Sequence, residues 1–121
     1  MKISCQVSLL ALAASFSNVA AQFITQLADP TDNTAARFIE LYFPAGYEPV
    51  SKLVRYTNDN VAYTASSAVD LSGATPGADG YLIVCGNKSE FELVYPGKTC
   101  DIAKSSIQSN GDDKIAVSVP S

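Results

Sequence analysis

The sequence contains no histidine, no tryptophan and few basic residues. Without histidine, the chain has neither the commonest general base nor the commonest metal ligand of proteins. A Ser–His–Asp triad, a Cys–His pair and a His-containing zinc site are therefore excluded within it. Eight Lys and Arg residues stand against 12 Asp and Glu, which gives a formal net charge of -4. Because binding through phosphates needs a basic face, we expect no nucleic-acid partner, and the poor acid–base inventory predicts that the chain is not an enzyme.

Long apolar runs are also lacking. None reaches the roughly 20 residues that a helix needs to cross a bilayer, so we expect no membrane span. Residues 1–21 have the three parts of a secretory signal peptide: the charge of Lys2, a short apolar core at residues 7–14, and small residues up to Ala21. We expect cleavage after Ala21 and a secreted, extracellular domain over residues 22–121. The alternative for the first segment is a buried N-terminal helix.

Cysteine is scarce, and its distribution favours a single bridge. Cys5 lies in the expected signal peptide, which leaves Cys85 and Cys100. An even number of cysteines in an exported chain predicts a disulfide bond, worth roughly 3 kcal/mol in the loop-entropy model. The alternative is two free, buried thiols. The spacing is not C-x-x-C and no histidine is present, so neither a redox motif nor a zinc site is favoured.

Short strands between turns are the main pattern beyond the leader. Alternating or continuous apolar segments predict strands over residues 23–27, 37–43, 52–57, 61–64, 68–71, 81–85 and 114–119. The Asx residues at 58–60 are expected to close a hairpin into residues 61–64. Residues 81–85 have no polar alternation, which is typical of a central strand covered on both faces.

One short helix is expected after the predicted strand at residues 81–85. Ser89 and Glu92 have the spacing of a capping box, and Pro96 with Gly97 ends the segment after a turn or two. Many short strands, frequent turns and little helix predict an all-β fold of the antiparallel β-sandwich type.

The segment ARFIELY at residues 36–42 resembles the FIELYN signature of lamin-tail domains. Further motifs follow in the order of that family: LVRYTN at 53–58, PG at 76–77, YLIV at 81–84 and SNGDD at 109–113. The resemblance covers about residues 23–119 and implies an immunoglobulin-like antiparallel β-sandwich with one short helix. Family members are usually non-catalytic modules, found in nuclear lamins and in exported microbial proteins, alone or beside nuclease and other hydrolase domains. The export signal favours the exported microbial type.

Two departures from the family pattern bear on the fold. Phe43 stands where the family has Asn after ELY, so any hydrogen bond made by that Asn is lost here. The sequence ends at Ser121, just after the last predicted strand, whereas relatives continue with at least one more. We expect either a missing C-terminal strand or an open sheet edge, and an open edge supports self-association through strand pairing.

Acidic residues gather in two turn-rich loops and form the candidate metal site. Oxygen-rich loops of this kind can hold Ca²⁺, although the spacing is not that of an EF-hand. The alternative is that these side chains build turns by bonding their own backbone. Ca²⁺ is the one cofactor that the sequence suggests, and its candidate ligands are Asp29, Asp32, Asp112 and Asp113.

Two further features suggest surface roles. The tripeptide Asn87-Lys88-Ser89 is an N-glycosylation sequon, so Asn87 is a candidate modification site. The tyrosines offer either an aromatic binding face for sugars or partners, or packing at the core and its rim. They are Tyr42, Tyr47, Tyr56, Tyr63 and Tyr81.

The sequence therefore predicts a secreted, non-catalytic, lamin-tail-type β-sandwich that acts as an interaction or adhesion module. Its expected partner is a protein or a polysaccharide. The alternative is an accessory domain of an extracellular hydrolase or nuclease, which would tether the enzyme to its substrate by glycan- or Ca²⁺-dependent binding.

Overall fold

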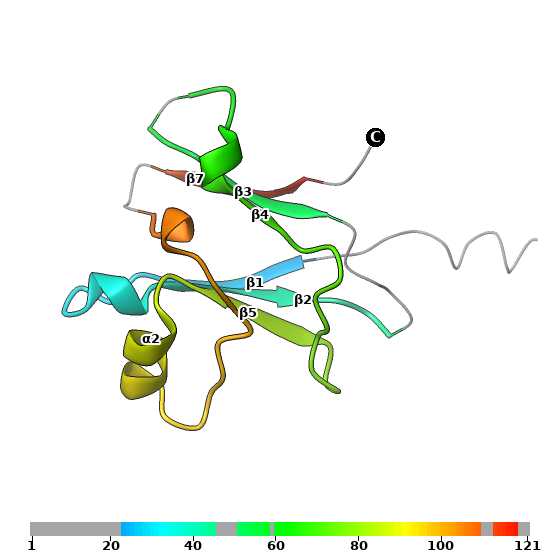
Figure 1. The fold of residues 1–121 in the computed structure, drawn as a ribbon, viewed down its shortest axis with the longest axis vertical. Coiled ribbons are helices and arrows are strands. Elements are labelled where there is room, and N and C mark those ends of the chain that lie inside the picture. Colours follow the sequence, from blue (N-terminus) through cyan, green and yellow to red (C-terminus); the bar gives the residue numbers. More distant parts are fainter. Residues whose placement is uncertain (1–22, 46–50, 59, 110–112, 119–121) are drawn as a thin grey trace, which may run out of the picture.

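Strands dominate the part of the chain that the computed structural model describes, which is residues 23–45, 51–58, 60–109 and 113–118. The expected signal peptide, with Cys5, and the candidate ligand Asp112 lie outside these ranges. Within them the chain forms strands in two sheets and one short α-helix (Figure 1). No helix of the described residues has the length and apolar character needed to cross a membrane.

The larger sheet has four strands, and its centre is the pairing of β2 with β5. Three of its strands pair antiparallel, but β6 runs parallel to β5, so the expectation of a wholly antiparallel fold is wrong at this edge. In spatial order the strands are β1 (Phe23–Ala28), β2 (Phe38–Tyr42), β5 (Tyr81–Cys85) and β6 (Ile102–Ala103).

The smaller sheet is wholly antiparallel, with β3 at its centre. Its outer strand β7 is a sheet edge, as is β1 in the larger sheet, and β1 carries a β-bulge between Ile24 and Gln26. Bulges are one way in which edge strands resist pairing with other chains. Self-association through an edge stays a prediction. The strands in order are β4 (Ala68–Asp70), β3 (Lys52–Tyr56) and β7 (Lys114–Ser118).

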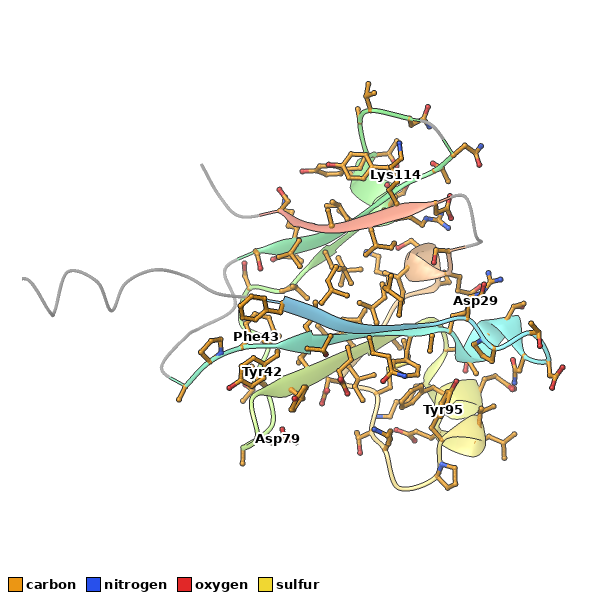
Figure 2. The ribbon with its side chains drawn as sticks, turned by 180° about the vertical axis from the view of Figure 1, so that it is seen from behind. Asp29, Tyr42, Phe43, Asp79, Tyr95 and Lys114 are labelled. Atoms are coloured by element: carbon orange, nitrogen blue, oxygen red, sulfur yellow. A yellow bond between two sulfur atoms is a disulfide. The ribbon has the colours of Figure 1, made fainter. Side chains whose placement is uncertain are left out.

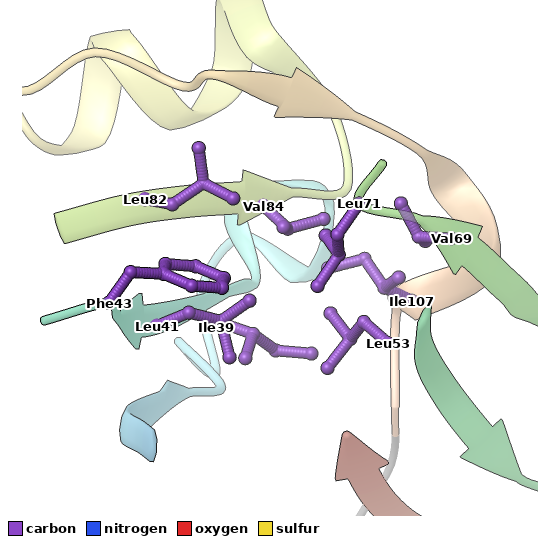
Figure 3. Close-up of a cluster of buried hydrophobic side chains, with 9 residues drawn as sticks. All are labelled: Ile39, Leu41, Phe43, Leu53, Val69, Leu71, Leu82, Val84 and Ile107. Carbon is purple, nitrogen blue, oxygen red and sulfur yellow. The ribbon is translucent and has the colours of Figure 1, made fainter. Parts of the chain in front are cut away.

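The main core lies between the two sheets. Alternate residues of β2 and of the position after it, Ile39, Leu41 and Phe43, point the same way and meet side chains of β3 and β4 (Figure 3). Each such side chain stabilises the fold by roughly 1.5–3 kcal/mol relative to an exposed one. The buried set is Ile39, Leu41, Phe43, Leu53, Val69, Leu71, Leu82, Val84 and Ile107.

A second cluster covers the opposite face of the larger sheet. Phe38 and Ile83 point outward from β2 and β5 and pack against Phe91 of helix α2 (Lys88–Val94). The rings of Phe38 and Phe91 meet edge to face with centroids 5.1 Å apart, an arrangement that aromatic pairs favour. Residues 81–85 are thus apolar on both faces, and the prediction of a central, covered strand is confirmed.

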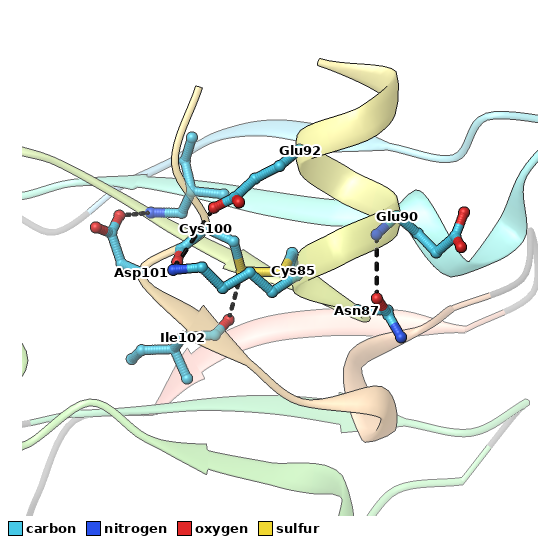
Figure 4. The surroundings of a disulfide bond; sticks show 9 residues. Cys85, Asn87, Glu90, Glu92, Cys100, Asp101 and Ile102 are labelled. Carbon is cyan, nitrogen blue, oxygen red and sulfur yellow. Dashed lines mark hydrogen bonds and ion pairs between the residues drawn. A yellow bond between two sulfur atoms is a disulfide. The ribbon is translucent and has the colours of Figure 1, made fainter. Parts of the chain in front are cut away.

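A disulfide joins Cys85, at the end of β5, to Cys100, with Cα atoms 5.8 Å apart. Both cysteines are buried in the second cluster, and the loop that they close carries α2 (Figure 4). Asp101 ties the far end of this loop to β5, because its N–H donates to the Ile83 carbonyl at 2.9 Å and its carboxylate accepts from the Ile83 N–H at 2.8 Å. The predicted pairing of the two cysteines is therefore confirmed.

The start of α2 differs from the sequence prediction. Asn87 is the N-cap, since its side-chain oxygen accepts from the Glu90 N–H at 3.1 Å, and Ser89 lies inside the first turn. The Ser89–Glu92 capping box is therefore wrong. Asn is among the best N-cap residues, and capping from residue 87 brings the start of the helix closer to the bridged Cys85.

Residues 61 and 62 form a bend and residues 63 and 64 have no regular structure, so the expected strand over 61–64 is wrong. Asn58 has a φ of 53°, which turns the chain, but the chain then runs outward and its residues 60–66 are exposed. β3 pairs instead with β4, which follows a short 3₁₀ helix. The 3₁₀ helices are η1 (Thr34–Ala36), η2 (Ala65–Ser67) and η3 (Ser105–Ile107).

Removing the disulfide with the double substitution C85A/C100A is expected to lower the free energy of unfolding by about 3 kcal/mol, because the unfolded chain gains the entropy of an open loop. Urea unfolding followed by far-UV circular dichroism measures this loss. The parent protein unfolded with a reductant is the matched control and should lose a similar amount. Identical unfolding midpoints with and without reductant would contradict a stabilising bridge.

Candidate binding cleft

A hollow lies at one end of the larger sheet. It is an open cleft of about 300 Å³, lined by residues 42–45 on one side and residues 76–80 on the other. Tyr42, Phe43 and Asp79 lie together at this end, away from Asp29 (Figure 2). Strand β2 thus delivers one wall, and the turn that precedes β5 delivers the other.

Hydrogen bonds hold the turn in place. The Gly77 N–H donates to the Tyr81 carbonyl at 2.9 Å, and the Gly80 N–H donates to the Gly77 carbonyl at 2.8 Å. The Asp79 carboxylate accepts from the Tyr81 N–H at 3.1 Å, which is the usual way in which Asp supports a turn. The Phe43 N–H donates to the Gly80 carbonyl at 2.8 Å and links the two walls. These bonds hold the turn against the end of β2.

Gly80 lets the two walls approach each other. Its φ is 87°, in the region that side chains rarely adopt, and a Cβ there would lie 2.6 Å from the Phe43 carbonyl oxygen and 2.8 Å from Cε2 of Tyr42. Only glycine combines this backbone angle with this contact. The residue type at position 80 thus sets the width of the cleft.

Aromatic and proline residues contribute apolar surface to the cleft and its surroundings. The rings of Tyr42 and Tyr81 are tilted against each other with centroids 5.2 Å apart, and Tyr81 is 39% exposed. Pro44 and Pro76 add rigid rings to the lining. Among the lining residues that the structure describes, the carboxylate of Asp79 is the only charged side chain. The cleft therefore offers flat apolar faces beside a hydrogen-bond acceptor.

The tyrosines form two separate pairs instead of one aromatic face. Tyr42 lines the cleft and its ring contacts that of Tyr81, whereas the rings of Tyr56 and Tyr63 meet edge to face, 5.8 Å apart, beside the smaller sheet. Tyr47 lies outside the described residues. The sequence signalled aromatic residues but not which of them would meet.

A second, open hollow of about 350 Å³ lies near Tyr63 and carries opposite charges. Lys52, Lys104 and Asp70 contribute to its lining. Hydrogen bonds from the backbone and side chain of Ser72, with a smaller contribution from Lys52, hold the pKa of Asp70 below its ordinary value. The Asp70 carboxylate is therefore committed to the turn at Ser72.

The predicted Ca²⁺ ligands have other partners wherever the structure describes them. Asp29 pairs with Arg37, and Asp113 pairs with Arg55 at 3.5 Å while accepting from the Asn58 N–H at 3.1 Å. The Asp32 carboxylate accepts from Thr31 Oγ1 at 3.4 Å. Within the described ranges no three acidic or cysteine side chains come together as a metal site. Ca²⁺ binding that involves Asp112 stays a prediction.

Asn87 is exposed at the edge of the disulfide loop (Figure 4). Its side-chain oxygen caps α2, whereas N-glycosylation takes place at the amide nitrogen. The cap and a glycan therefore use different atoms of one side chain. Modification of Asn87 stays a prediction that this geometry supports.

Comparison of the chain with protein-family models, with curated proteins and with solved structures found no match. The resemblance to lamin-tail domains thus depends on the motifs within this sequence. The cleft and the fold around it therefore carry the structural evidence on what the chain does.

Sequence reasoning missed the residues that shape the cleft. The dipeptides Pro76-Gly77 and Asp79-Gly80 signalled a turn. They gave no sign that this turn would close on the end of β2, because that contact depends on the register between β2 and β5.

The substitution G80A is expected to destabilise the fold by more than G73A. Gly73 has a φ of 78°, but no atom of the described residues lies within 4 Å of the place that an alanine Cβ would take, so G73A isolates the backbone penalty of about 1–2 kcal/mol. G80A adds the collision with Phe43 and Tyr42 and should also shift the NMR signals of both cleft tyrosines. Urea unfolding of the two variants measures the difference, and equal losses would contradict a tight approach at Gly80.

Loss of the cap through N87A is expected to cost about 1 kcal/mol of stability, whereas S89A should leave stability almost unchanged. N87D keeps an acceptor oxygen at the cap and should behave like S89A. All three variants destroy the sequon, so protein secreted from a eukaryotic host should lose the mass of one glycan in each. Intact-mass spectrometry and thermal unfolding check the two roles separately. An unmodified parent protein would contradict the glycan, and unchanged stability of N87A would contradict the cap.

Proposed function

We propose that this chain is a secreted, non-catalytic binding domain of the lamin-tail type with an immunoglobulin-like β-sandwich, acting as an interaction or adhesion module. The observation that carries the proposal is the cleft lined by residues 42–45 and 76–80, whose walls are held by hydrogen bonds within the protein. A site held in this way has less freedom to lose when a ligand binds, which lowers the entropic cost of binding.

The positions of the motifs support the proposed family. FIELY coincides with β2, LVRY lies in β3 and YLIV lies in β5. These segments contribute much of the core between the two sheets. A resemblance that falls on the framework, and not on scattered surface residues, is what shared architecture would produce.

The disulfide supports an extracellular setting. Such bonds persist in oxidising compartments and are rare in the cytosol. Here the bridge anchors the loop that carries both α2 and the Asn87 sequon. The leader, the bridge and the sequon therefore agree with one another.

The chemistry of the cleft favours binding over catalysis. General acid–base catalysis needs positioned groups that exchange protons. Asp79 uses one carboxylate oxygen to hold the turn, and the chain has no histidine to act with it.

The second candidate is an accessory domain that tethers a hydrolase or nuclease to a polymer. The paired rings of Tyr42 and Tyr81 favour it, because aromatic faces suit sugars. A catalytic domain encoded in the same gene would favour this role over a free-standing adhesion module.

Replacing Tyr81 by alanine, Y81A, is expected to weaken capture of the natural partner from the extracellular fraction of the source at least tenfold, since it removes the ring that supports Tyr42. Y63A is the matched control, because Tyr63 is 38% exposed and also belongs to a ring pair. Surface plasmon resonance measures the affinity of both variants for the captured partner. Hydrolase and nuclease assays on the same protein should give no turnover. Reproducible turnover that a single substitution abolishes would overturn the non-catalytic role.

A further inference from the structure

We propose that the cleft between Tyr42 and Asp79 binds one ring of a neutral glycan. This inference rests on the proposed binding function and names its ligand class. A pyranose ring has apolar C–H faces and a rim of hydroxyl groups. The cleft has the complementary parts, with the Tyr42, Pro44 and Pro76 rings as apolar surface and the Asp79 carboxylate as acceptor.

The hydrogen bonds that the cleft residues already make favour a ligand that donates hydrogen bonds. The N–H groups of Phe43, Gly77 and Gly80 already donate within the protein, and Pro44 and Pro76 have no N–H. A carboxylate can accept about four hydrogen bonds, so Asp79 keeps acceptor capacity after its bond from Tyr81. Sugar hydroxyls supply donors that match this capacity.

The same hydrogen bonds argue against a proline-rich peptide, the other ligand that aromatic grooves take. Proline residues offer carbonyl acceptors and no N–H donors. A proline-rich chain would need donors on the wall of the cleft, and the N–H groups of Phe43, Gly77 and Gly80 are not available for it, which makes such a peptide the less favoured ligand.

The charge of the cleft further restricts the class of glycan that is expected to bind. The described lining residues include no Lys or Arg, their one charged group is Asp79, and the whole chain has a net charge of -4. Sulfated or uronic-acid glycans would meet this field as like charges. An uncharged saccharide meets no such repulsion.

The small volume of the cleft predicts a weak affinity. The volume of about 300 Å³ lies at the small end of ligand sites and suits a single ring. A single ring predicts a weak dissociation constant, on the order of 1 mM for a monosaccharide. Tight attachment would then depend on several domains meeting one polymer.

Amide and ring NMR signals of the full secreted protein test the inference during titration with defined saccharides. The probes are neutral β-glucan and chitin oligosaccharides, for a polysaccharide source, and high-mannose oligosaccharides, for a glycoprotein source. A proline-rich peptide flanked by arginine is titrated in parallel. We expect one neutral saccharide class to shift signals of residues 42–45 and 76–81.

The variants Y42L and D79N are expected to weaken that saccharide about tenfold, since each removes one half of the recognition. In D79N the amide oxygen can still accept from the Tyr81 N–H, so the turn is kept while the charge is lost. Y63A is the control and should bind like the parent. Thermal unfolding confirms that each variant is folded before it is titrated.

Three results would overturn the inference. If a saccharide bound Y42L and D79N as tightly as the parent protein, its site would lie elsewhere. If only the proline-rich peptide shifted the NMR signals, the ligand would be a protein. An absence of shifts from every saccharide would remove the glycan. In each case the proposed binding function is judged separately, by the capture experiment with Y81A and by the turnover assays.

Discussion

The register between β2 and β5 is the constraint on which the rest of the structure depends. It sets Tyr42 opposite Tyr81 and Phe38 opposite Cys85. A slip of one residue would exchange the two faces of a strand, and it would move Leu41 out of the core and Phe38 away from Phe91. Because both faces of these strands are covered, the register is specified twice, once by the core between the sheets and once by the cluster under α2.

The two ends of the β2–β5 strand pair differ in what covers them. At the Cys85 end the disulfide loop folds back over the sheet, and Asp101 closes it against Ile83. At the Tyr42 end the chain turns through Gly80 and leaves a hollow in place of a cap. One end of the pair is thus sealed by covalent and hydrogen bonds, and the other is open and lined by rings. Under the proposed function, the end with the hollow is the one that contacts a partner.

The sequence predicted the strands with their own apolar pattern well, and it failed where a neighbour decides the outcome. Residues 81–85 form β5 as expected, because a continuous apolar run must be buried wherever it lies. Residues 61–64 have β-forming side chains, but β3 takes β4 and β7 as its neighbours, so no pairing site beside β3 remains for them. The two-residue β6 is too short for any periodicity. The cleft combines a strand end with a distant turn, and only the register brings them together.

The departure at Phe43 links the proposed family to the cleft. Phe43 is 2% exposed, and its ring packs in the core between the sheets, while its N–H donates to Gly80 across the cleft. An Asn side chain in the same place would bring polar groups into an apolar cluster, which costs free energy unless they find partners. Phenylalanine instead anchors the strand end through apolar contact and leaves the backbone to fix the turn. The residue that departs from the lamin-tail signature is therefore the one that fixes the end of β2, by its ring in the core and by its N–H at Gly80.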